Sequence, residues 1–123
     1  MSPHDPTVND LFEHFAEIRY VSIYKDGILT SKQRSMLANT SSADTDRYEE
    51  LLVNPVILTA TRQRGNIDCE GLNFIIIAYG SFFQLIKEIH GGHISICLDK
   101  QTDITSAPGK IFDFLKSVLF STN

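Results

Sequence analysis

Residues 71–100 read GLNFIIIAYGSFFQLIKEIHGGHISICLDK, and this stretch decides the fold. It holds three apolar runs of strand length, which are cut at Tyr79–Ser81 and again at His90–Gly92. The runs are rich in isoleucine and phenylalanine, which favour strands, and a glycine at each break allows the backbone angles of a tight turn. The stretch therefore predicts an antiparallel meander of three strands, over residues 72–79, 82–89 and 93–99.

A shorter hairpin is predicted before the meander. Residues 20–24 (YVSIY) alternate in polarity, and Asp26-Gly27 separates them from a second apolar run at 28–30. An Asp-Gly pair between two such runs is a strong hairpin signal. The return strand becomes polar from residue 31 onward, which is typical of a sheet edge that avoids unwanted pairing.

Two helices are predicted at the ends of the chain, each from an apolar stripe of helical spacing. The first covers residues 7–18, with Thr7 as its cap, and follows a loose tail at residues 1–6. The other covers residues 106–120, with Ser106 as its cap.

A further helix is predicted in the middle of the chain, after a Ser-rich loop at 35–43 that we expect to be a plain connection. It begins at Asp44 or Thr45, and Gly65 ends it. Its apolar stripe continues straight through Pro55. The proline therefore either kinks one helix or opens a second, collinear helix capped by Asn54.

Charged side chains mark both ends of this middle helix. Glu49 and Glu50 lie near its start and Arg62 and Arg64 near its end, as the helix dipole favours. The two glutamates diverge by about 100° around a helix, so they do not share a site. The acidic residues therefore need no functional explanation, and the arginines are either plain surface residues or partner contacts, because exposed arginine is common at interfaces.

Length and composition point to one ordinary globular domain, spanning residues 1–123. The net charge is −4 and no cluster of Lys or Arg stands out, so nucleic acid is not an expected partner. No apolar run approaches the roughly 20 residues that span a bilayer. The N-terminus is polar and lacks the pattern of a secretion signal, so a cytoplasmic location with two free cysteines is expected.

No constellation in the sequence predicts catalysis, a metal or a cofactor. His90 and His93 supply two metal ligands where a structural zinc needs four. His93 and Cys97 lie about 13 Å apart along one strand, too far for a nucleophile–base pair. No carboxylate is placed in the sequence to orient His93, and neither phosphate-binding glycine motif occurs. We therefore expect a protein that is not an enzyme.

The predicted elements run helix, two strands, helix, three strands, helix. This order is economical as an α+β fold with a single five-stranded antiparallel sheet and helices on both faces. The strand over 72–79 is apolar on both faces, so it needs cover on both. It is either a buried central strand or an edge strand that a partner covers.

Two motifs carry a family resemblance: YGSFFQLIK at residues 79–87, followed by GGHIS at 91–95. With the order of elements, they make the chain resemble the roadblock/LC7 family, within the wider profilin-like and longin-like group. The resemblance covers nearly the whole chain, but its motifs are apolar residues and glycines rather than chemistry. It implies a sheet order of 2-1-5-4-3, a homodimer, and a non-catalytic module that scaffolds or regulates small Ras-like GTPases or serves as a dynein light chain.

In that family two copies pair through the edge of the third strand and pack their second helices together. The resemblance implies the following dimer contacts here: Leu51, Leu58, Arg62, Leu72, Phe74, Ile75, Ile76 and Ile77. The long loop at 35–43 and Pro55 depart from the commonest family pattern, and both bear on the second helix. The alternative function is a small-molecule sensor of similar shape, with its ligand between the sheet and the second helix.

Overall fold

The computed structural model describes residues 3–34 and 47–117. The Ser-rich loop at 35–43, the predicted cap at Asp44 or Thr45 and the last residues of the predicted final helix lie outside these ranges. Within them, no helix is both long and apolar enough to cross a membrane.

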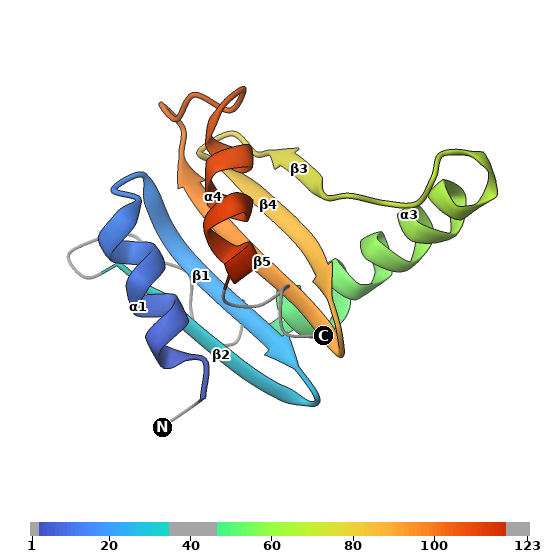
Figure 1. Cartoon of the computed structure of the whole chain (residues 1–123), viewed down its shortest axis with the longest axis horizontal. Coiled ribbons are helices and arrows are strands. Elements are labelled where there is room, and N and C mark those ends of the chain that lie inside the picture. Colours follow the sequence, from blue (N-terminus) through green and yellow to red (C-terminus); the bar gives the residue numbers. More distant parts are fainter. Residues whose placement is uncertain (1–2, 35–46, 118–123) are drawn as a thin grey trace.

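A five-stranded antiparallel sheet forms the centre of the fold (Figure 1). Its order is β2-β1-β5-β4-β3, which confirms the order expected from the resemblance. The strands span these residues: β1, Ile18–Lys25; β2, Ile28–Gln33; β3, Ile75–Ala78; β4, Phe82–Ile89; β5, Gly92–Asp99. The Asp-Gly hairpin and the meander are both confirmed, and β5 lies between β1 and β4.

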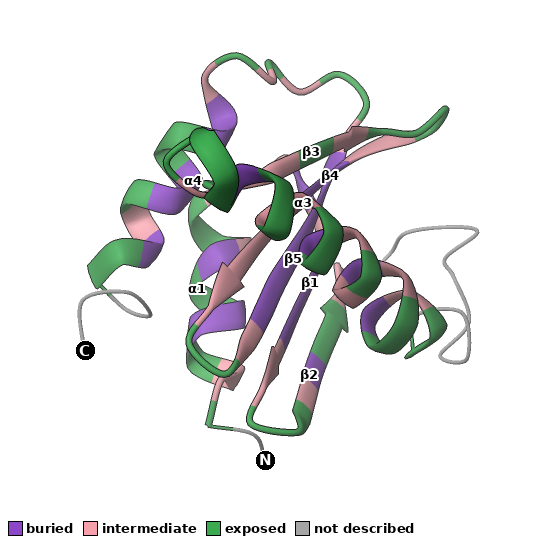
Figure 2. Cartoon of the chain, turned by 90° about the vertical axis from the view of Figure 1, so that its right-hand side faces the viewer, coloured by how far each residue is buried: buried purple, intermediate pink, exposed green. Residues whose placement is uncertain are grey.

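Helices cover both faces of the sheet, as expected (Figure 2). The helices α1 (Asp5–His14) and α4 (Ala107–Leu115) lie on one face, and the π-helical turn η1 (Glu49–Val53) and helix α3 (Asn54–Asp68) lie on the other. The main hydrophobic core lies under α1 and α4, where Leu11 and Ile111 meet Val21, Leu85 and Ile96.

The boundaries of the terminal helices differ from the prediction. Helix α1 begins at Asp5 and ends at His14, because Pro6 suits the first helical turn and extended backbone at Phe15 ends the helix. Thr7 is therefore buried inside the helix rather than capping it. Ser106 does precede α4, but its side chain makes no capping hydrogen bond.

Arg34, at the end of β2, holds the C-terminal end of α1 to the sheet. Its guanidinium donates hydrogen bonds to the carbonyl oxygens of Phe12, Phe15 and Ile18, at 2.7–3.1 Å. It also lies over the Phe12 ring, 5.0 Å from the ring centroid. In the sequence, Arg34 is only one of the polar residues that indicate a sheet edge. In the structure, its side chain also satisfies backbone carbonyls that lack a partner where α1 ends.

The middle helix is continuous but not uniform. The π-helical turn η1 runs directly into α3, with Pro55 in the first turn of α3 and no break between them. Asn54 has helical backbone angles and makes no side-chain cap, so the predicted capping role is wrong. Gly65 does not end the helix, which continues to Asp68. A Cβ at Gly65 would lie 3.0 Å from the backbone of Gly71, so the glycine permits a close helix–loop contact.

Strand β3 is shorter than predicted and lies at an edge of the sheet. It covers Ile75–Ala78 and pairs only with β4, so the interpretation as a buried central strand is wrong. Leu72 and Phe74 precede the strand, and the Phe74 ring packs 5.0 Å from that of Phe112 in α4. The other edge is β2, where the polar residues of the sequence predicted an edge.

Candidate functional site

The sheet face beneath η1 and α3 is unusually polar. Alternation along β1, β4 and β5 directs Ser22, Gln84, His93 and Ser95 to this face, and each is at most 2% exposed. From the helical layer, Glu50 and Asn54 are both fully buried against them. Burying a polar side chain costs free energy unless the side chain is hydrogen-bonded. The stability of this layer therefore depends on the hydrogen bonds that its side chains make.

Glu50 is the centre of the buried polar layer. Its Oε1 lies 2.8 Å from His93 Nε2 and accepts a hydrogen bond from Asn54 Nδ2 at 3.0 Å. Its Oε2 accepts a longer one, 3.4 Å, from the Tyr20 hydroxyl. In the tautomer that donates to Glu50, His93 carries its proton on Nε2.

One prediction is wrong here. A carboxylate does orient His93, and it comes from 43 residues away along the chain. Glu50, which the sequence analysis attributed only to the acidic start of a helix, is fully buried. The helix-dipole argument accounts for an acidic helix start but says nothing about which side chain faces the sheet.

The π-helical turn explains how Glu50 reaches the sheet. The Asn54 N–H bonds to the Glu49 carbonyl, five residues back, which widens this turn relative to an α-helix. Pro55 has no N–H, so it closes no bond to the same turn. Single π-helical turns often occur at functional sites. The sequence signal for an irregular turn here was the apolar stripe that continues through Pro55.

Several buried acceptors in this layer have no partner among the described residues. Gln84 Nε2 donates to Ser95 Oγ at 2.9 Å, but Gln84 Oε1 is unpaired. Asn54 Oδ1 and Ser22 Oγ are likewise buried without a partner. Most buried polar atoms in proteins are satisfied, so three such atoms in one layer mark it as a candidate site rather than plain packing.

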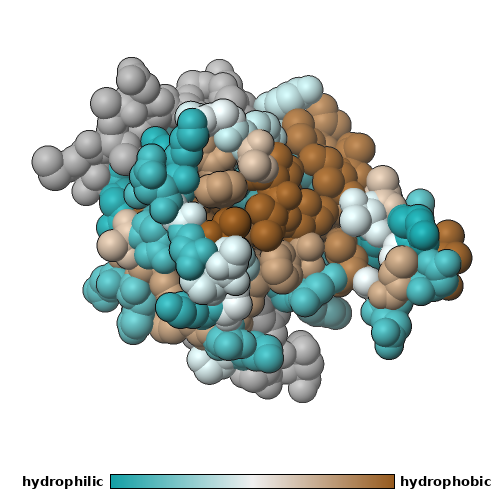
Figure 3. Space-filling view, turned by 90° about the horizontal axis from the view of Figure 1, so that it is seen from above, coloured by the Kyte–Doolittle hydropathy of each residue, from teal (hydrophilic) through white to brown (hydrophobic). Residues whose placement is uncertain are grey.

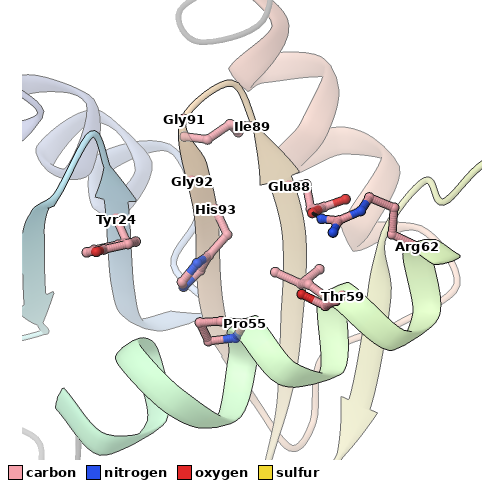
Figure 4. A pocket seen from close by; sticks show the side chains of 10 residues that line it. Tyr24, Pro55, Thr59, Arg62, Glu88, Ile89, Gly91, Gly92 and His93 are labelled. Carbon is pink, nitrogen blue, oxygen red and sulfur yellow. Dashed lines mark hydrogen bonds and ion pairs between the residues drawn. The ribbon is translucent and has the colours of Figure 1, made fainter.

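A cleft opens from this layer between α3 and the β4–β5 hairpin (Figure 4). Its volume is about 350 Å³. Pro55, Thr59 and Arg62 line it from α3, and Glu88 and His93 face them from the sheet. Arg62 and Glu88 form an ion pair across the cleft. On its other side the Tyr24 ring lies 5.8 Å from the His93 ring.

Two glycines shape the hairpin end of the cleft. Gly91 has φ +87°, a left-handed conformation that favours glycine. A Cβ at Gly92 would lie 1.7 Å from the Tyr24 carbonyl oxygen, so only glycine fits where β5 meets β1. The sequence correctly marked these glycines as a turn, and the close approach to β1 adds a second requirement.

The residues expected at a dimer contact occupy different environments. Ile76 is 41% exposed and Leu51 40%. Leu72, Phe74, Ile75 and Ile77 are half-buried. Leu58 is buried against the sheet and Arg62 is paired with Glu88, so these two already have partners within the protomer.

The helical layer carries an apolar outer face, on the side turned away from the sheet. Tyr48, Leu51, Leu52 and Val56 are exposed on it, and a shallow groove of about 420 Å³ runs along it. In Figure 3, seen from the β3 side of the molecule, hydrophobic side chains gather into one broad area. Tyr79 follows β3, and its pKa is raised. Burial is the main cause, and the negative charges of Glu49 and then Cys97 add to it.

The other side chains that could ligate a metal do not gather. His90 is exposed in the hairpin turn while His93 is buried, and no three metal-ligating side chains come together within residues 3–34 and 47–117. Cys69 is exposed and Cys97 buried, and neither forms a disulfide.

Comparison with known proteins does not assign this chain to a family. No model of a known protein family matches the chain, and no curated protein matches it in sequence.

Proposed function

We propose that the protein is a non-catalytic interaction module that works as a homodimer. The observation that supports this most is the open edge of β3, where Ile76 is 41% exposed and lies opposite Leu85, on the sheet face that α1 and α4 cover. An apolar strand edge invites pairing with any other exposed strand. A second copy related by a two-fold axis would cover this edge and continue the sheet from one protomer into the next.

The outer face of η1 and α3 also suits a contact between two copies. Leu51, Leu52 and Val56 are apolar and between 40% and 60% exposed, and they line or flank one shallow groove. A homodimer contact buries such a surface against its own copy, and contacts of this kind are more apolar than the rest of a protein surface. The contact would therefore combine the β3 edge with the outer face of η1 and α3.

The order of strands agrees with the resemblance to the roadblock/LC7 family. That resemblance favours a role in scaffolding or regulating a small Ras-like GTPase or another signalling protein. The chain would then act in the cytoplasm through surfaces rather than through a reaction.

Ile76→Lys is the variant that tests the proposed contact. It should convert the dimer to a monomer or to aggregate, because each copy would bring an unpaired ammonium group into the contact. Sedimentation velocity measures the change. Ile28→Lys is the matched control, since Ile28 is an exposed isoleucine in β2, at the opposite edge of the sheet. An Ile76→Lys protein that still sediments as a dimer would rule out β3 as the contact.

A second candidate function is small-molecule sensing. The observation that favours it is the cleft between α3 and the sheet, in the position expected for a ligand of such a sensor. Its volume of about 350 Å³ falls at the small end of the usual range for ligand pockets. Several polar groups converge on it, and this is the feature that separates binding pockets from surface irregularities.

A further inference from the structure

We infer that the cleft between α3 and the β4–β5 hairpin binds a primary ammonium group. This inference deepens the second candidate function and rests on it. The cleft is lined by Tyr24, Thr59, Arg62, Glu88 and His93, together with apolar contacts from Pro55, Leu58 and Ile89. Both the hydrogen-bonding groups in the cleft and the net charge of the cleft favour this class of ligand.

The polar groups in the cleft are mainly acceptors. When neutral His93 donates its Nε2–H to Glu50, its Nδ1 is left as an acceptor with no partner among the described residues. The hydroxyl groups of Tyr24 and Thr59 make no hydrogen bond within that part of the chain and can also accept. Arg62 is the one lining side chain that only donates, and Glu88 occupies it. A ligand rich in donors therefore fits best.

The charges in and behind the cleft favour a cation. Arg62 and Glu88 offset each other, while the Glu50 carboxylate faces an imidazole and an amide. With His93 as the neutral imidazole, the formal charge of the site is negative. Lys25, at the hairpin end, pairs with Asp26 at 3.9 Å and donates to the His90 carbonyl. The Tyr24 ring adds a surface that attracts ammonium groups.

The size of the cleft limits the ligand to a short chain. About 350 Å³ in an open cleft accommodates an alkylammonium of a few carbons. Either a free amine or a lysine side chain of a partner protein carries this group. Both present the same donors to His93 and Glu88, so a binding experiment can compare them directly.

The test is an NMR titration of the ¹⁵N-labelled protein at constant pH and ionic strength. The probes are 1,4-diaminobutane and Nα-acetyl-lysine amide, with sodium acetate and glycerol as comparison compounds. Both amines should give saturable shifts at Gly91, Gly92 and His93, with dissociation constants of about 1 mM. A clear preference for the lysine compound would indicate a partner side chain, and the reverse a free amine.

The Arg62–Glu88 pair supplies the decisive variants because its two members should act in opposite directions. Glu88→Gln removes an anionic acceptor and leaves Arg62 uncompensated, so it should weaken amine binding about tenfold. Arg62→Gln removes the competing cation and should tighten binding several-fold. A purely structural role would shift both variants the same way. Arg64→Gln and Asp68→Asn are the controls, because they alter an exposed ion pair in the last turns of α3.

The outcomes of this titration distinguish a wrong ligand class from a wrong sensing function. Saturable amine binding with opposite shifts in the two variants supports the inference. Binding of acetate or glycerol in preference to the amines would overturn the ligand class but leave a sensing function standing. A protein that binds none of the four probes would overturn both the ligand class and the sensing function. Equal shifts in the two variants would also overturn the inference.

Discussion

Replacing Glu50 by alanine should lower the free energy of unfolding by about 4 kcal/mol. The carboxylate accepts hydrogen bonds from His93, Asn54 and Tyr20, and Glu50 is fully buried. Its loss would leave these donors buried without their acceptor and open a cavity between η1 and the sheet. Chemical denaturation followed by circular dichroism measures the change.

Two further variants give this prediction its scale. Glu13→Ala makes the same substitution at an exposed position of α1 and should change stability by less than about 0.5 kcal/mol. Glu50→Gln keeps the shape of the side chain and one acceptor oxygen. Its loss of stability should therefore fall between those of Glu50→Ala and Glu13→Ala. If Glu50→Ala unfolds at the same denaturant concentration as Glu13→Ala, the buried layer does not stabilise the fold.

Gly92→Ala should destabilise the protein by about 3 kcal/mol. The added Cβ would lie 1.7 Å from the Tyr24 carbonyl oxygen and 2.7 Å from its carbonyl carbon. Both are backbone atoms of β1, so neither can turn aside as a flexible side chain would. The pairing of Gly92 with Lys25 would have to open. Thermal unfolding should show a large fall in the melting temperature.

Gly80→Ala is the matched control for this variant. Gly80 lies in the turn before β4, and a Cβ there meets nothing within 4 Å. Its stability should therefore stay close to that of the unmodified protein. Similar melting temperatures for the two variants would mean that β1 and β5 do not approach each other as closely as described.

The strands were more predictable than the helix that covers their polar face. Period-two alternation and the turn signals at Asp26-Gly27 and Gly91-Gly92 are local, so the hairpin and the meander follow from the sequence. The order of strands came from the family resemblance. The edge position of β3 could not be derived from its residues, because an apolar run suits a buried strand and a partner-covered edge equally well.

The candidate site was hidden for a physical reason. Glu50 and His93 are 43 residues apart, and only the folded chain brings them within 2.8 Å. A regular α-helix was assumed where η1 is wider, and the helical phase decides which acidic residue faces the sheet. Gly65 was misread in the same way, since glycine both ends helices and permits close packing against them.

The turn η1 joins the buried polar layer to the proposed dimer surface. Glu50 points inward to the buried layer, while Leu51 and Leu52 are exposed on the outer face. The same five residues therefore fix the sheet side and present the apolar groove. A change in the cleft that shifts η1 would also shift the proposed dimer surface.

The proposed homodimer requires that a second copy covers the open edge of β3. An isotope-filtered NOE experiment on a mixture of labelled and unlabelled protein can detect this contact. We expect intermolecular NOEs from Ile76 and its neighbours in Ile75–Ala78 to the same strand of the partner copy. A spectrum whose intermolecular NOEs avoid β3, or a sample with none, would contradict it.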